Sequence, residues 1–264
     1  MVKRLLGEGH TIIACDRAQD QAGAWLDRLP ADQQGRVHFY PLDVTKEEQV
    51  NALADTLRGK GIHVAYLVNN AGIHGAGTES RVWERTLRVN IHGTFYLTRA
   101  FSPAMKEKHF GRIVNLASLS AYHPLGEQGP YAAAKAAIAG FTRATALDLA
   151  RDGVTVNAIA PGLILHDGLK VVFSDAELGR MASGIPVGRA GKPEEIAATV
   201  SFLLSNDAAW ADRSKAFAAK VHELISFLVD VRGMKGVGQS LIGRAAYHDS
   251  CSGLRELGIK DQPR

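Results

Sequence analysis

The feature that most constrains the fold is a regular alternation of short β-branched segments with longer amphipathic segments through residues 1–209. The short segments predict strands at 11–15, 37–41, 64–68, 113–117 and 154–159. The longer segments predict helices at about 20–29, 46–59, 80–101, 131–151 and 193–205. Strands alternating with helices favour an α/β fold, a doubly wound parallel sheet with helices on both faces.

Polar or turn-forming residues stand where these predicted strands end: Asp16, Asp43, Asn70, Ser118 and Pro161. In open parallel sheets, ligands bind beyond the carboxyl ends of the strands. We therefore expect these five residues to line one crevice.

The first seventeen residues predict the end of a helix, a glycine, a strand and a terminal acid. Gly7 is expected to supply the left-handed stop of the helix, and Asp16 to end the strand at 11–15. This is the second half of a dinucleotide-binding βαβ unit, in which the acid accepts hydrogen bonds from the adenosine ribose. The first half, a strand and a glycine-rich phosphate loop, is expected upstream of Met1, and no stretch of this sequence supplies it.

Composition narrows the class of protein. The chain has 264 residues, 46% hydrophobic and 22% charged, enough for one core plus a small appendage. Its two cysteines favour a reducing, cytoplasmic setting, and no apolar run reaches the ~18 residues of a membrane span. Of the net charge of +4, residues 210–264 carry +3, with nine basic and six acidic side chains, so no basic stripe indicates nucleic-acid binding.

The chemistry centres on Tyr131 and Lys135, which lie four residues apart and so share one face of the predicted helix. An ammonium group beside a phenol lowers the pKa of the phenol towards neutrality, as a general acid/base requires. Ser118, at a strand end, can hydrogen-bond a substrate oxygen beside that tyrosine. The alternative is a solvent-exposed helix pair with no catalytic role.

Several motifs occur together with this pair, in a fixed order. They are Asn69-Asn70-Ala71-Gly72, Val89-Asn90, Ile113-Val114-Asn115 with Ser118, Asn157 to Pro161-Gly162, Ile185-Pro186 with Arg189, and Gly191-Lys192-Pro193-Glu194-Glu195. With them, residues 1–209 resemble a short-chain dehydrogenase/reductase of the type that includes 3-oxoacyl-carrier-protein reductases. The resemblance implies a Rossmann-like fold and hydride transfer between a nicotinamide cofactor and a small-molecule alcohol/carbonyl pair. It also implies a homo-oligomer.

The resemblance implies catalytic roles for four residues of this sequence. Tyr131 would be the acid/base, Lys135 would tune it and hold the nicotinamide ribose, and Ser118 would orient the carbonyl. Asn90 would support a proton-relay water.

The resemblance further implies the cofactor contacts. Those beside the adenosine, ribose and carboxamide would be Asp43, Val44, Asn70, Ala71, Gly72, Pro161 and Gly162, and the catalytic pair Tyr131 and Lys135 would contact the cofactor as well. A carboxylate at Asp16 accepts both ribose hydroxyls and repels a 2′-phosphate, which favours NAD over NADP, although Arg17 could accommodate that phosphate. The histidines show no ligand spacing, so we expect no metal site.

The pattern changes near Trp210. In place of the family's last strand, residues 210–264 predict a helical extension. It resembles a fragment of the cysteine-rich domain of lactate-utilisation and glycolate-oxidase iron–sulfur subunits. The resemblance implies that Cys251 is a cluster-associated cysteine, and the favoured alternative is a lone buried thiol. We therefore expect two parts, 1–209 and 210–264, and a weakened oligomer. The loss of the glycine loop predicts weak cofactor binding and little turnover. The alternatives are a non-catalytic remnant or fusion product, or an electron-transfer or interaction fragment.

Overall fold

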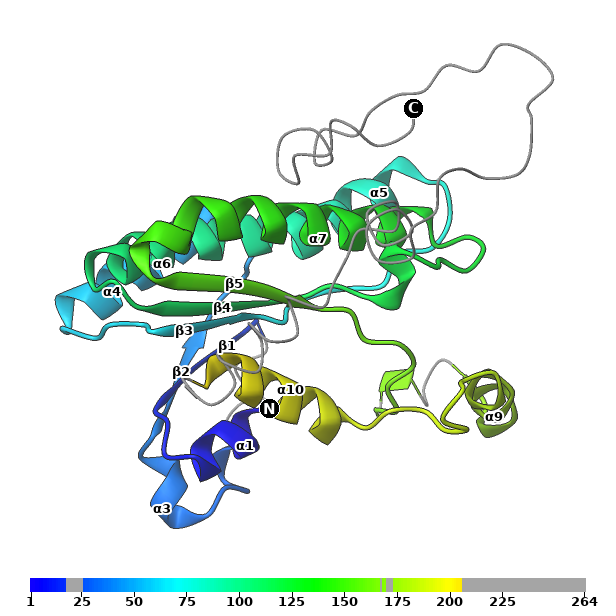
Figure 1. Ribbon diagram of the computed structural model, residues 1–264, viewed down its shortest axis with the longest axis horizontal. Coiled ribbons are helices and arrows are strands. Elements are labelled where there is room, and N and C mark those ends of the chain that lie inside the picture. The colour runs from blue at the N-terminus through cyan, green and yellow to red at the C-terminus, as the bar shows by residue number, and fades with distance from the viewer. Residues whose placement is uncertain (18–25, 167, 170–172, 206–264) are drawn as a thin grey trace, which may run out of the picture. The chain divides into compact units, whose positions relative to one another are not determined.

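The computed structural model describes residues 1–17, 26–166, 168–169 and 173–205, which belong to one compact unit, Met1–Ser205 (Figure 1). Most of the helix expected at 20–29 lies outside the described residues. The segment 210–264, with its predicted helix and Cys251, lies outside them entirely.

In the described part of the chain, the paired strands of each sheet run parallel, so the expected α/β fold is confirmed. A two-stranded sheet pairs β1 (Ile12–Asp16) with β2 (Val37–Pro41). A three-stranded sheet has the order β3 (Tyr66–Asn69), β4 (Gly111–Leu116), β5 (Val154–Ile159), so β4 is central.

Within the described residues, the two sheets share no ladder. The Ile12 amide donates to Arg36 and the Asp16 carbonyl accepts from Leu42, so alternate residues of β1 bond to β2. The backbone groups of Ile13 and Cys15 therefore turn away from β2. By the same alternation, Tyr66 and Val68 turn away from β4, because the neighbouring Ala65 carbonyl accepts from Arg112. These outward-facing groups form no ladder between β1 and β3 in the described residues.

Helices cover both faces of the three-stranded sheet (Figure 1). On one face lie α4 (Glu47–Gly59), α5 (Ser80–Leu87), α6 (Gly93–Glu107) and α7 (Gly129–Leu149). On the other lie α1 (Val2–Gly7) and α10 (Pro193–Leu204). Two short helices, α3 (Ala31–Gln34) and α9 (Asp175–Ser183), lie further from the three-stranded sheet.

Two local expectations are wrong. The single helix expected at 80–101 is instead α5, a π-helical turn η1 (Arg88–His92) and α6, which runs on to Glu107. A π-turn carries one extra residue per turn and often marks a functional position. The left-handed residue after α1 is Gly9, with φ 91°, whereas Gly7 is still helical.

Strand β4 separates two apolar clusters. Ile113, with no exposed surface, joins Leu57 and Met105 under α4 and α6. Val114, equally buried, turns to the other side and packs with Leu5 and Val200 from α1 and α10. Burial on both faces is what a central parallel strand requires, and it fixes where the carboxyl end of β4 lies.

Candidate active site

The carboxyl end of β4 brings Ser118 beside Pro161. Beyond the end of β4, the Ala117 amide donates to the Ile159 carbonyl, and the Leu119 amide donates to the Pro161 carbonyl, both at 2.8 Å. Ser118 lies between these two bonds and is 8% exposed. Its Oγ accepts a bond from the Ser120 amide at 3.1 Å, which turns the chain at this point. The two strand ends predicted at Ser118 and Pro161 therefore meet.

Lys135 is buried on α7 with its ammonium group at the same strand end. Its Nζ donates to the Leu116 carbonyl at 2.7 Å and lies 5.6 Å from the centre of the Tyr131 ring. The side chain is 4% exposed, and burial lowers the pKa of Lys135 to about 8. The group is therefore mostly protonated at neutral pH and places a positive charge beside the tyrosine. The spacing argument from the sequence is confirmed for this pair.

Asn90 lies in the π-turn η1 and is fully buried. Its Nδ2 donates to the carbonyls of Ile73 and Thr86, both at 2.9 Å. Its Oδ1 has no hydrogen-bond partner within the described part of the chain. A buried amide oxygen without a partner is rare in folded proteins and indicates a missing donor such as a bound water.

Gly72 allows Asn90 and Lys135 to approach each other. A Cβ atom at Gly72 would lie 2.7 Å from Asn90 Oδ1 and 3.3 Å from Lys135 Nζ. The first distance is a steric clash, so only glycine fits between these groups without movement. The oxygen of Asn90 and the ammonium group of Lys135 thus converge on one point of the loop that follows β3.

Buried amides beneath the site bond to other side chains. The Oδ1 of Asn115 accepts from Asn69 at 2.8 Å and its Nδ2 donates to Thr142 at 2.9 Å. Asn69 also donates to Thr98 at 3.1 Å. The network links β3 and β4 to α6 and α7, because both strands present a buried amide towards those helices.

His74 is a site residue that the sequence reasoning missed, since it weighed this histidine only as a metal ligand. Its imidazole packs on the Tyr131 ring with the ring centres 5.0 Å apart and the planes at 42°. The one available signal was its position, two residues after Gly72 in the motif that follows β3.

Of the residues expected on the adenosine side, Arg17 and Asp43 line a cavity, and the others lie elsewhere. A cavity of about 280 Å³ is lined by Arg17, Asp43, Thr45, Arg81, Glu84, Arg85, Arg88 and Val89. Asp16 is exposed at the end of β1, and Asn70 and Ala71 are exposed after β3. Val44 is not part of this lining. It packs in the core below α4, where a Cβ at Gly93 would lie 2.8 Å from its side chain.

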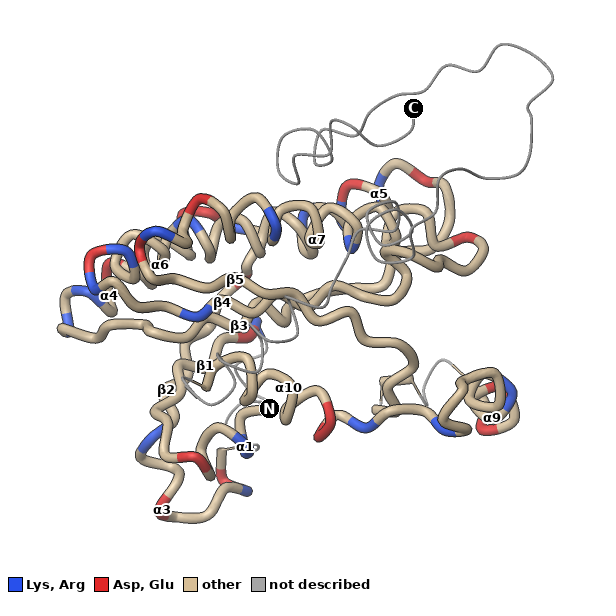
Figure 2. The backbone as a smooth tube through the Cα atoms, in the orientation of Figure 1, with Lys and Arg blue, Asp and Glu red and all other residues tan. Residues whose placement is uncertain are grey.

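Four arginines and two carboxylates, Asp43 and Glu84, line this cavity. Burial raises the pKa of Asp43, but hydrogen bonds from Thr45 and the charges of Arg17 and Lys46 outweigh it, so that pKa lies below its usual value. Arg85 in α5 and Arg88 in η1 lie three residues apart on one helical stretch, and both line the cavity. Figure 2 shows basic and acidic residues near α5. Sequence reasoning missed these two arginines. Together with Arg17 they form a cationic lining that fits a phosphate-bearing nucleotide.

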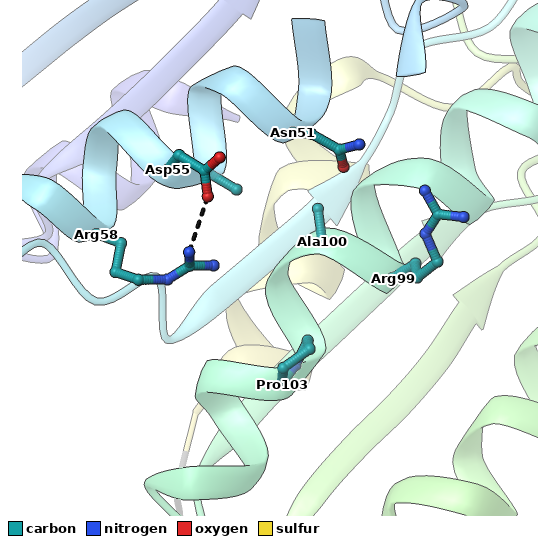
Figure 3. Close-up of a pocket in the computed structure, with 7 residues that line it drawn as sticks. Asn51, Asp55, Arg58, Arg99, Ala100 and Pro103 are labelled. Atoms are coloured by element: carbon teal, nitrogen blue, oxygen red, sulfur yellow. Dashed lines mark hydrogen bonds and ion pairs between the residues drawn. The ribbon is translucent and has the colours of Figure 1, made fainter. Parts of the chain in front are cut away.

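A second cavity, of about 370 Å³, lies between α4 and α6, lined by residues that Figure 3 shows. Its charged side chains have partners: Arg58 pairs with Asp55 at 2.8 Å, and Arg99 pairs with Glu47. None of the catalytic residues expected from the sequence lines it, and we assign it no function.

Over the described ranges, no group of three or more His, Cys, Asp or Glu side chains could hold a metal ion. In that same part of the chain, every helix is too short or too polar to cross a bilayer.

Comparisons with known proteins give a consistent result. The family described as enoyl-(acyl carrier protein) reductase matches residues 1–213. A hexahydro-indene-carboxyl-CoA reductase of Mycobacterium tuberculosis is 36% identical over 209 residues, which are 77% of this chain and 80% of the relative. The 3-oxoacyl-[acyl-carrier-protein] reductase FabG of Escherichia coli is 33% identical over 214 residues, which are 80% of this chain and 86% of the relative.

Solved structures agree. ElxO with NADP bound aligns with a TM-score of 0.74 and 26% identity, over 78% of this chain and 86% of that one. A variant of actinorhodin polyketide ketoreductase with NADPH aligns with a TM-score of 0.72 and 31% identity, over 79% of this chain and 85% of that one.

Proposed function

This chain belongs to the short-chain dehydrogenase/reductase family of oxidoreductases, and we propose that it transfers hydride between a nicotinamide cofactor and an alcohol/carbonyl pair. One observation carries the assignment of the site. The buried ammonium group of Lys135 lies beside the Tyr131 ring and at the strand end that leads to Ser118. A buried charge is costly, and a cation placed beside a phenol is what a tyrosine acid/base needs.

The chemistry follows from these groups. When bound, the reduced nicotinamide supplies the hydride. Tyr131 donates its hydroxyl proton to the carbonyl oxygen during reduction, and Lys135 stabilises the phenolate that remains. The Ser118 hydroxyl donates to the same oxygen and so supports the negative charge that develops on it. In the oxidation direction, the Tyr131 phenolate takes the proton back.

Asn90 supplies the acceptor for a proton relay. Its partnerless Oδ1 faces the same point as Lys135 Nζ, close to the backbone of Gly72. A water bound there would accept from Lys135 and donate to Asn90, and would pass a proton from solvent to Tyr131. This role rests on the resemblance and is supported by the orphaned oxygen.

The cofactor proposal departs from the expectation of NAD. The preference for NAD over NADP, drawn from Asp16, is not supported, since the two solved relatives hold NADP or NADPH. The cationic lining at Arg17, Arg85 and Arg88 supports NADP(H) in this chain. The remaining expected contacts, Asn70 to Gly72 and Pro161-Gly162, stay part of the proposal.

We also propose that cofactor affinity is low. The edges of β1 and β3 share no ladder, so the adenosine side and the catalytic side are not held by one continuous sheet in the described residues. Ordering the two sides would then cost binding free energy. A version carrying a strand and glycine-rich loop ahead of Val2 should bind NADPH more tightly, and equal affinity in the two proteins would remove this part of the proposal.

The experiment for function measures loss of reduced nicotinamide with 3-oxoacyl thioesters and simple ketones as probes. NADPH is expected to support reduction better than NADH. Arg17→Ala should weaken NADPH binding about tenfold or more while leaving NADH binding nearly unchanged, because only NADPH carries the 2′-phosphate. Equal loss for both cofactors would place Arg17 outside the phosphate site.

The expected homo-oligomer also remains a proposal. Trp83 on α5 and Phe95 on α6 are large apolar side chains that are 45% and 40% exposed. Light scattering on the purified chain would test for it.

A further inference from the structure

The loop that carries His74 is fixed on both sides of this residue. On one side, the Ile73 carbonyl accepts from the buried Asn90 side chain at 2.9 Å. On the other, Gly75 packs so closely on Thr86 that a Cβ at Gly75 would lie 2.0 Å from Thr86 Oγ1. Thr86 is 1% exposed, so the contact is with the core and not with a mobile side chain.

The next part of the loop is also held. The Gly77 amide donates to the Glu127 carbonyl at 2.9 Å, and Gly77 has φ 97°, a conformation open mainly to glycine. The loop after β3 is therefore tied to the segment that leads into α7. His74 itself stays exposed at the surface of this fixed loop.

Tyr131 lies near the start of α7 and its side chain is only half-buried. Two groups flank its ring: Lys135 Nζ at 5.6 Å and the His74 imidazole at 5.0 Å from its centre. Lys135 comes from the same helix one turn on, whereas His74 comes from the loop after β3. Among the described residues, His74 is the one aromatic side chain in contact with the Tyr131 ring.

We propose that His74 is a positioning residue, whose imidazole holds the Tyr131 ring in the rotamer that points the hydroxyl at the substrate carbonyl. The inference rests on the proposed function of Tyr131. A half-buried tyrosine samples other staggered rotamers unless a neighbour blocks them. Small errors in the position of a catalytic group cost large factors in rate.

The test separates the ring contact from other roles of His74. We expect His74→Ala to lower kcat about tenfold to hundredfold, with the KM for the carbonyl probe and the Kd for NADPH nearly unchanged. His74→Phe keeps a ring and should retain most of kcat, whereas His74→Asn keeps hydrogen-bonding atoms without a ring and should behave like His74→Ala. An unchanged kcat in His74→Ala, or a loss of kcat in His74→Phe as large as in His74→Ala, would overturn the proposal.

A second measurement does not depend on turnover. In protein labelled with fluorotyrosine, the resonance of Tyr131 is assigned by its loss in Tyr131→Phe. We expect one narrow line in the starting protein and in His74→Phe, and a broadened or split line in His74→Ala, because the ring then samples a second rotamer. One narrow line in all three proteins would overturn the positioning role. If no carbonyl probe is reduced but the line splits as expected, the proposed reaction fails while the positioning role stands.

Discussion

The two sheets of this molecule differ in how deeply they are buried. Five of the six residues of β4 are buried, and its two neighbouring strands pair with it along their length. In β1, no residue is fully buried, and the last two are exposed. The proposed catalytic residue Ser118 follows β4 of the three-stranded sheet, whereas Asp16 and Arg17 lie at the end of β1 in the two-stranded sheet. The proposed catalytic side therefore rests on the more deeply buried sheet, and the proposed adenosine side rests on the more exposed one.

This difference indicates where the site is pre-organised. Lys135 bonds to the last residue of β4, and Asn69 and Asn115 link β3 and β4 to the helices above them. Arg85 and Arg88, in contrast, are exposed. Under the proposed function, a cofactor that orders such side chains would bind at an entropic cost.

The largest expected effect compares equivalent isoleucines in the two sheets. Ile113→Ala in β4 removes a fully buried side chain and should lower the free energy of unfolding by about 2–5 kcal/mol. Ile13→Ala in β1 removes a half-buried side chain and should cost roughly 1–2 kcal/mol, because less apolar surface leaves contact. Denaturant unfolding of both variants checks the order, and equal losses would remove the distinction between the sheets.

The second effect concerns the charge buried on the catalytic side. Burial lowers the pKa of Lys135 from 10.5 to about 8, so the unfolded chain binds more protons between these values. The burial penalty is therefore fully present below pH 8, and stability should rise by about 2–3 kcal/mol as pH increases from 8 to 10.5. Lys135→Met lacks this penalty. The starting protein gains stability between pH 8 and 10.5 and the variant does not, so the stability of Lys135→Met relative to the starting protein should fall across that window. A difference in stability between the two proteins that does not change with pH would contradict the burial of the charge.

A smaller effect sharpens the geometry at Gly72. Gly72→Ala should lower stability by about 1–3 kcal/mol, because the added Cβ would meet Asn90 Oδ1 and Lys135 Nζ. Gly140→Ala, inside α7 where a Cβ would meet nothing within 4 Å, is the matched control and should stabilise by about 0.5–1 kcal/mol. Thermal unfolding of both proteins measures the pair. Changes in stability of opposite sign in the two variants support the close approach at Gly72. A Gly72→Ala variant as stable as the starting protein would contradict it.

Much of the fold could be predicted because the strands carry strong local patterns. The strands expected at 37–41 and 154–159 have the bounds seen, since β-branched or aromatic residues and adjacent turns mark them. The π-turn at Arg88–His92 could not be predicted, because helical periodicity does not record one inserted residue. Pairing between strands is also invisible to local patterns, so the separation of β1 from β3 appears only in the structure.

The candidate site divides in the same way. The spacing of Tyr131 and Lys135 is a helical rule and was sufficient to place both side chains together. The contact of His74 with Tyr131 joins residues 57 positions apart in different elements, and no spacing rule predicts it. The arginines at 85 and 88 were likewise missed, because their meeting with Arg17 depends on tertiary packing.

The central claim is that Tyr131 is the proton donor of a nicotinamide-dependent carbonyl reduction. Single-turnover oxidation of enzyme-bound NADPH by a carbonyl probe tests it most directly, with the starting protein and Tyr131→Phe measured side by side. The phenylalanine variant keeps the ring that His74 contacts and should bind NADPH with unchanged affinity. Its rate should fall by about 10²–10⁴-fold, because only the proton-donating hydroxyl is lost. A rate within a few fold of the starting protein, at equal NADPH occupancy, would contradict the account.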